Sequence, residues 1–289
     1  MNFEDKYYSV EPTLIELGDA SIALRKYGNT GPNIIFIHGF PTHGYTWRKI
    51  LPELSKNNTC YVLDLPGLGD SVWKYSTDFN CEAQADRVIE LAKELNLPEY
   101  TIIAHDSGAT VARIIALKQK QAVDKLVLIN TEMPNHRPPW IPLYQAIGLL
   151  PFVPFTIRLN LRCRWFVHSP MGFRQFYSDT SQLDVAENMD PYLKPLINSQ
   201  RKAIGAFKYL KGIDWKKIDA FEKTHKDIKA ETLLLWGEDD ITFPVHLAEE
   251  MVSQFKDNCV LIRLKNASLL PHEEQYEEVN RCISDFLSN

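Results

Sequence analysis

Asp106 lies in a segment whose residue types could perform nucleophilic chemistry. A short apolar run, residues 101–104, precedes it, and the small residues Gly108 and Ala109 follow it at the start of an apolar helical pattern. Small flanking residues permit a turn sharp enough to lift one side chain above a sheet, at a helix N-terminus whose N–H groups favour negative charge. The pattern therefore predicts a nucleophile elbow with Asp106 as the nucleophile.

Two other interpretations of this turn stay open. Ser107 is a second candidate nucleophile. If Ser107 is the nucleophile, however, His105 stands two residues before it, where the pattern needs a small residue. Asp106 could also act only as a helix cap, because Asp is a favoured N-cap residue.

The elements that would position this turn alternate along the chain. Short apolar runs at 34–37, 61–63, 126–129 and 232–236 suit strands buried on both faces of a sheet. Amphipathic or apolar helical patterns at 82–95, 109–117, 246–255 and 275–287 lie between or after them. Such alternation predicts a mostly parallel sheet covered by helices, with functional groups in the loops at the carboxyl ends of the strands.

An insertion interrupts the alternation. Nine of the 17 prolines lie between Pro134 and Pro195, where aromatic residues are also frequent. Proline at this density prevents long helices. We expect residues 135–225 to form a cap of short helices and residues 1–134 and 226–289 to form the core domain.

Bulk composition limits the classes of function. The chain has 289 residues and a net charge of −5, which gives no reason to expect nucleic acid or an anionic membrane as a partner. The five cysteines contain no CxxC pair, which favours reduced thiols in the cytosol over a disulfide framework or a zinc site. No signal peptide or membrane-spanning segment is expected.

Four segments in one order resemble the α/β-hydrolase superfamily. They are residues 38–42 (HGFPT), 105–109 (HDSGA), 236–244 (WGEDDITFP) and 271–275 (PHEEQ). The resemblance implies an α/β-hydrolase fold with a mostly parallel eight-stranded sheet, helices on both faces and an inserted helical cap. Asp at the elbow is similar to the branch that contains epoxide hydrolases and haloalkane dehalogenases.

The resemblance implies a mechanism without cofactor or metal. The carboxylate attacks an electrophilic carbon, and water activated by a histidine then hydrolyses the resulting ester. Backbone N–H groups of Phe40 and Ser107 would form the oxyanion hole. Asp240 would orient the histidine, with Glu132 as a second candidate for that acid.

The expected histidine is absent from its usual position. Alignment on Glu273 and Glu274 puts Leu269 there, and leucine cannot move a proton. Three interpretations compete: His272, three residues later, acts as the base; another histidine such as His43, His105 or His136 acts; or the site lacks a base. Without a base, the ester would accumulate.

Substrate class is predicted from the cap. Haloalkane dehalogenases of this branch carry a halide-holding Trp after the nucleophile, where this chain has Ser107, whereas epoxide hydrolases use cap tyrosines as acids. We expect Trp140, Tyr144 and Tyr209 to contact a small apolar substrate, and the apolar run 146–155 to line the entrance. Hydrolysis of an ester or lactone and non-catalytic ligand binding are the alternative functions. Oligomeric state is not predicted.

Overall fold

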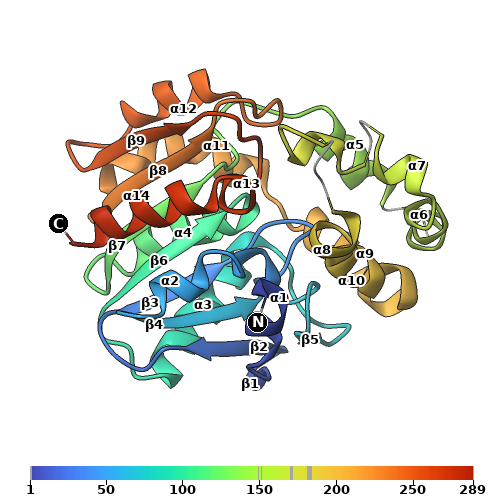
Figure 1. Cartoon of the computed structure of the whole chain (residues 1–289), viewed down its shortest axis with the longest axis horizontal. Helices are drawn as coiled ribbons and strands as arrows, with labels where there is room; N and C mark the ends of the chain where they lie inside the picture. Colours follow the sequence, from blue (N-terminus) through green and yellow to red (C-terminus); the bar gives the residue numbers. More distant parts are fainter. Residues whose placement is uncertain (1, 149, 151, 170–171, 181–183, 289) are drawn as a thin grey trace.

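A twisted sheet runs through the centre of the protein (Figure 1). The structure, a computed structural model, describes residues 2–148, 150, 152–169, 172–180 and 184–288. Eight strands follow the order β1-β2-β4-β3-β6-β7-β8-β9, and the short β5 pairs with β2 outside that path. The strands are β1 (Thr13–Leu17), β2 (Ala20–Tyr27), β3 (Asn33–Ile37), β4 (Thr59–Asp64), β5 (Val72–Trp73), β6 (Tyr100–His105), β7 (Val123–Ile129), β8 (Glu231–Gly237) and β9 (Cys259–Leu264).

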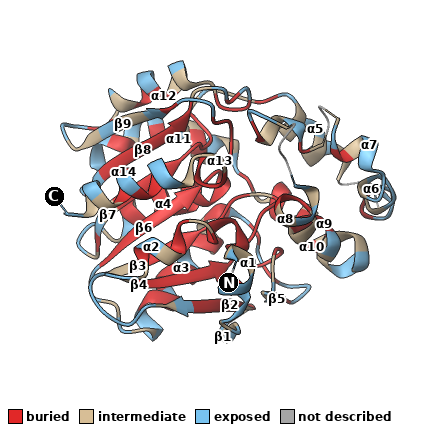
Figure 2. Ribbon diagram, viewed as in Figure 1, coloured by how far each residue is buried: buried red, intermediate tan, exposed pale blue. Residues whose placement is uncertain are grey.

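Pairing is parallel from β4 through β3, β6, β7 and β8 to β9, and antiparallel where β1 and β2 join the edge. This confirms the predicted mostly parallel sheet. Every residue of β6 is buried, since strands lie on both of its sides and helices on both of its faces. The apolar runs seen in the sequence are therefore the central strands, drawn red in Figure 2.

Helices cover both faces of the sheet. The described helices near the sheet are α1 (Phe3–Tyr8), η1 (Gly44–Trp47), α2 (Leu51–Leu54), α3 (Cys81–Glu94), α4 (Ser107–Lys118), α11 (Trp215–Thr224), η3 (His225–Asp227), α12 (Val245–Val252), α13 (Pro271–Glu274) and α14 (Tyr276–Ser288). Alternate strand residues point to opposite faces. One set packs with α3, α4, α11 and α12, and the other packs with η1, α2 and α14.

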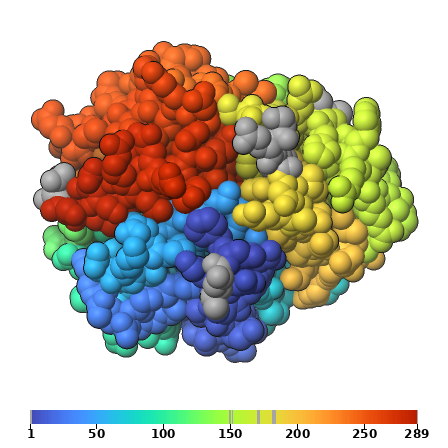
Figure 3. All heavy atoms as spheres, viewed as in Figure 1, coloured from blue at the N-terminus to red at the C-terminus, as the bar shows by residue number. Residues whose placement is uncertain are grey.

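A group of short helices lies at one side of this core, on the right in Figure 1. They are α5 (Trp140–Ile147), α6 (Val153–Leu161), α7 (Arg164–Val167), η2 (Arg174–Phe176), α8 (Val185–Asn188), α9 (Asp190–Asn198) and α10 (Gln200–Lys211). Prolines stand in the first turns of α6 and α9, as the proline density suggested. Figure 3 shows this group, coloured yellow-green to orange, against the core.

The next helix, α11, lies within the range 135–225 that the sequence predicts for the cap. Its Ile218 and Phe221 are buried in the cluster that covers one face of the sheet, and that cluster also contains Ala206, Tyr209 and Leu210 of α10. The boundary at residue 225 stays a prediction.

No helix of the described residues is both long and apolar enough to cross a lipid bilayer.

Candidate active site

Asp106 occupies the turn between β6 and α4. Its backbone has φ 50° and ψ −132°, a conformation that an L-residue adopts only where the surroundings enforce it. A Cβ on Gly108 would lie 2.2 Å from the carbonyl oxygen of His38, and a Cβ on Gly39 would lie 2.3 Å from Cβ of Asp106. The turn is thus a tight elbow in which the neighbouring small residues are sterically required.

The Asp106 carboxylate faces backbone donors. Its Oδ2 accepts a hydrogen bond from the N–H of Phe40 at 2.7 Å and from the hydroxyl of Ser107 at 3.1 Å. The backbone N–H of Ser107 also bonds to this carboxylate, so both donors expected from the sequence point at it. Burial, followed by the nearby charge of Glu132, raises the pKa of Asp106 to about 8 in spite of these bonds.

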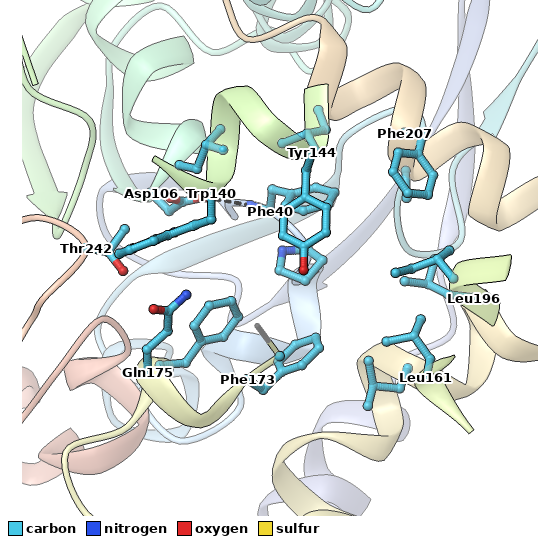
Figure 4. Close-up of a pocket in the computed structure, with 18 of the residues that line it drawn as sticks. Phe40, Asp106, Trp140, Tyr144, Leu161, Phe173, Gln175, Leu196, Phe207 and Thr242 are labelled. Atoms are coloured by element: carbon cyan, nitrogen blue, oxygen red, sulfur yellow. Dashed lines mark hydrogen bonds between the residues drawn. The ribbon is translucent and has the colours of Figure 1, made fainter. Parts of the chain in front are cut away.

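A cavity between the core and the cap opens onto Asp106 (Figure 4). Most of its wall is apolar, and its described lining residues include no His, Lys or Arg. Among its aromatic and aliphatic side chains are Trp140, Ile157, Leu161, Phe173, Leu196 and Phe207. A carboxyl group at the end of an apolar cavity is thus available to a small apolar molecule.

A second carboxyl group lines the same cavity. Glu132 is buried; its Oε2 accepts hydrogen bonds from the hydroxyls of Thr110 and Thr131, and its Oε1 has no hydrogen-bond partner among the described residues. The guanidinium of buried Arg113 donates to the backbone carbonyl of Glu132 at 2.9 Å and so holds this loop against α4. Burial raises the pKa of Glu132.

Asp240 lies in the loop after β8 and is also buried. Its Oδ2 accepts from the side-chain amide of Asn130 at 2.6 Å, and its Oδ1 accepts from the backbone N–H groups of Thr242 and Phe243 at 2.7 and 3.1 Å. Burial raises its pKa to about 7. The carboxyl group expected to orient a histidine thus bonds to an amide and two backbone groups, and no imidazole contacts it among the described hydrogen bonds.

Leu269 lines the cavity together with Asp106. Its backbone oxygen accepts a hydrogen bond from Nε2 of His105 at 2.8 Å. An apolar side chain is therefore present at the place where the sequence pattern predicted a missing base.

His272 lies elsewhere. Its Nε2 is 2.6 Å from the Thr46 hydroxyl, and that hydroxyl donates to Oε1 of Glu273, so the ring N–H donates to Thr46. The ring packs against Trp47 with 4.7 Å between ring centroids, and burial holds its pKa well below the usual value. His272 is not among the lining residues of the cavity. This position does not suit the role of general base considered for it.

The other candidate histidines bond to backbone carbonyls. His43 donates to Pro191, and His136 donates to Thr242, as His105 does to Leu269. None of them is among the described residues that line the cavity.

Comparison with known proteins places the chain in a family. The model of the family described as "alpha/beta hydrolase fold" matches residues 32–266. The chain belongs to this α/β-hydrolase family.

Relatives of this α/β hydrolase include epoxide hydrolase 3 of Xenopus tropicalis, which is 25% identical over 276 residues, 89% of this chain and 71% of the relative. The solved epoxide hydrolase CorEH has a TM-score of 0.80 at 18% identity and covers 96% of this chain, with 99% of CorEH matched. A putative lipase from Acinetobacter baumannii also reaches 0.80, at 19% identity, over 99% of this chain and 96% of the lipase. The similarities support hydrolase activity in general.

Cap residues of this α/β hydrolase divide into two groups. Trp140 and Tyr144 line the cavity, and Figure 4 shows the hydroxyl of Tyr144 directed toward its interior. Tyr209 is not a lining residue: its hydroxyl is 3.1 Å from Oγ of Ser107, and its ring stacks on Phe40. Tyr209 thus contacts Ser107 and Phe40 at the turn instead of the cavity.

The apolar run at 146–155 does not have the expected position. Its Leu149 and Pro151 lie outside the described residues, and none of the others lines the cavity. Phe152 and Phe155 are more than half exposed instead. The wall is built by the next turns of α6, through Ile157 and Leu161, because that face of the helix points inward.

Sequence patterns did not single out several lining residues. Phe173, Gln175 and Phe176 come from η2 and the segment before it, and Ala203, Ala206 and Phe207 come from α10. The two small residues and Phe207 follow the helical spacing of one face, which could have indicated α10. No such periodicity exists for the residues near η2.

No group of three or more His, Cys, Asp or Glu side chains that could hold a metal ion occurs among the described residues.

Proposed function

We propose that this α/β hydrolase opens epoxides of small apolar molecules by forming an ester on Asp106, and that hydrolysis of this ester is slow. The observation that carries the proposal is the Asp106 carboxylate itself. It stands at the elbow, faces an apolar cavity and has Oδ2 bound by the N–H of Phe40. Oδ2 carries the hydrogen bonds from the N–H of Phe40 and the hydroxyl of Ser107, so Oδ1 is the oxygen that would attack.

The first half-reaction balances without a cofactor. Oδ1 of ionised Asp106 attacks an epoxide carbon, the carbon–oxygen bond of the ring breaks, and the released oxygen takes a proton from the phenol of Tyr144. The product is a hydroxyalkyl ester of Asp106. Tyr144 suits this role because its hydroxyl end is directed into the cavity that Asp106 faces.

The second half-reaction needs a base that removes a proton from water. A positioned general base contributes roughly 10²–10⁴ in rate. Leu269 lines the cavity where the base is expected, and the described lining residues include no histidine. Glu132 is the remaining cavity carboxyl, but burial raises its pKa and its Oε2 is bound to two threonines. Slow ester hydrolysis follows from this composition.

Carbon–halogen bonds are the second electrophile that Asp106 could attack. The halide would leave without protonation, so Tyr144 would not be needed. Ser107 stands in the position after the nucleophile, and its hydroxyl bonds to Asp106 and Tyr209. Because Ser107 stands where haloalkane dehalogenases of this branch carry their halide-holding Trp, epoxides are the favoured class.

Intact-mass measurement after incubation with matched epoxides and haloalkanes tests the proposal. Epoxide opening adds the whole mass of the epoxide, whereas halide displacement adds the mass of the haloalkane less HX. We expect a lasting epoxide adduct on the peptide that carries Asp106. Asp106→Asn, which keeps the shape of the side chain and removes the nucleophile, should give no adduct; an adduct on that variant would contradict the proposal.

Reversible ligand binding is the alternative, favoured by one observation. With a pKa raised to about 8, Asp106 is mostly protonated at pH 7 and resembles a neutral polar group at the end of an apolar cavity. Tight binding that survives Asp106→Asn, with no adduct on the unmodified protein, would favour it. Labelling of Ser107 by an organophosphonate would favour the ester or lactone hydrolase instead.

A further inference from the structure

Large apolar side chains are exposed on two successive helices of the cap. Phe152, Phe155 and Leu159 are 57%, 55% and 48% exposed on and just before α6, and Trp165 on α7 is 78% exposed. The spacing of the first three puts them on one side of a helix. We call Phe152, Phe155, Leu159 and Trp165, together with Arg162 and Arg164 between them, the outer cap face. In Figure 2, α6 and α7 lie at the end of the protein farthest from the sheet.

The segment that carries this face has charges of one sign. Residues 133–178 contain five arginines and no Asp, Glu or Lys, although the whole chain has a net charge of −5. Arg162, Arg164 and Arg174 are exposed and form no ion pair among the described residues. The net charge gave no reason to expect an anionic membrane, but it averages over an acidic core and a basic cap.

We propose that the outer cap face docks on the surface of an anionic lipid bilayer. A helix face with Phe, Leu and Trp beside arginines is the composition of a segment that lies in the interface, with the rings among the acyl chains and the guanidinium groups at the lipid phosphates. Trp at such a boundary is favoured because its ring is amphipathic. Helix α6 has nine residues and thus lies on the bilayer rather than crossing it.

A second copy of the chain is the competing occupant. A two-fold interface brings the same patch of both copies together, so the arginines of one copy would face those of the other. Residues 133–178 offer no carboxylate to neutralise them. Charge complementarity therefore favours the anionic bilayer.

The same helix forms part of the cavity. Ile157 and Leu161 point into it from the inner side of α6, while Phe155 and Leu159 point outward. Docking would thus place one wall of the cavity against the bilayer, from which an apolar molecule could enter. Entry of a substrate from the bilayer rests on the proposed function. Docking itself does not, and it is measured without an assay of enzyme activity.

Co-sedimentation of the full chain with vesicles tests the proposal. We expect binding to vesicles of phosphatidylcholine mixed with phosphatidylglycerol to exceed binding to phosphatidylcholine alone by roughly tenfold or more, and to weaken as salt is added. Phe155→Glu/Trp165→Glu should abolish binding. The matched control is Leu14→Glu/Val260→Glu, which makes the same change at two exposed positions on β1 and β9 and should bind normally.

Fluorescence locates the contact. Trp165 is the one exposed tryptophan of the six, all of which are described. Its emission should shift to shorter wavelength on the mixed vesicles, and Trp165→Phe should lose the shift while it still binds. Absence of binding by the unmodified chain, or equal binding by Phe155→Glu/Trp165→Glu, would overturn the proposal. So would a dimer in sedimentation velocity that this double variant abolishes, because a second copy would then cover the face.

Discussion

The side-chain amide of Asn130 donates to Oδ2 of Asp240 at 2.6 Å, and no imidazole contacts that carboxyl group among the described hydrogen bonds. The carboxyl group that the sequence predicts as the orienting acid thus bonds to an amide and to two backbone N–H groups. Leu269, whose side chain lines the cavity with Asp106, is the residue whose replacement would supply a base.

Leu269→His should convert the single-turnover reaction that we propose into a catalytic one. An imidazole at the cavity wall could take a proton from water beside the Asp106 ester, and a positioned base is worth roughly 10²–10⁴ in rate. Product formed per enzyme would then exceed one equivalent in a burst experiment. Leu269→Gln is the control, since it is polar but accepts no proton at neutral pH. If Leu269→His stays stoichiometric, the missing base does not explain slow hydrolysis.

Ester formation should accelerate as pH rises through about 8. The attacking form of Asp106 is the carboxylate, and burial together with the charge of Glu132 raises its pKa to about 8. Glu132→Gln removes that neighbouring charge and should lower the pKa. The rate at pH 7 should then rise, by up to about tenfold when most of Asp106 becomes ionised. Adduct formation followed by mass against pH measures this shift; an unchanged profile would contradict it.

Asp106→Asn should stabilise the fold at neutral pH and above. Folding raises the pKa of the Asp106 carboxyl group from its ordinary value of 3.8 to about 8. The free energy of unfolding therefore falls as pH rises from 3.8 to about 8, because the unfolded chain ionises this group and the folded protein does not. Over this pH range, the difference in free energy of unfolding between Asp106→Asn and the unmodified protein should grow by up to about 1.4 kcal/mol per pH unit. Urea unfolding at pH 5 and pH 8 measures it. Asp257→Asn, at an exposed position, should show no such trend.

Two tyrosines should differ in their effect on epoxide opening. Tyr144 lines the cavity, whereas Tyr209 bonds to Ser107 outside it. Tyr144→Phe should lower the rate of epoxide adduct formation by roughly 10²-fold or more, because an acid is lost. Adducts with haloalkanes, which need no acid, should be unaffected. Tyr209→Phe should change neither by a comparable factor, and the reverse ranking would move the acid role to Tyr209.

His272→Gln should affect stability rather than chemistry. The ring is buried, packs on Trp47 and donates to Thr46. Replacement disturbs a buried hydrogen bond and its packing, at a cost of roughly 1–3 kcal/mol in the free energy of unfolding. Rates of ester formation and breakdown should stay the same. A selective loss of ester breakdown would restore His272 as the base, and exposed His246→Gln serves as the control.

Local patterns predicted much of this protein. The turn at Asp106 and the central strands could be read from residue types because each depends on short-range rules: small residues at a tight turn and apolar runs in buried strands. The donors Phe40 and Ser107 were expected from the resemblance to α/β hydrolases instead. The change at Leu269 was equally visible, since it is a single residue within an otherwise familiar pattern.

Only the tertiary structure decided which histidines reach the cavity and which residues line it. His272 and Asp106 are far apart in sequence, and the loop before α13 turns the His272 ring toward Thr46 instead of the cavity. In the cap, prolines break the periodicity that would mark an inner face, so the inward direction of Ile157 and the outward direction of Phe155 could not be read from an unbroken apolar run. Side-chain direction there depends on packing between helices, which sequence spacing alone does not specify.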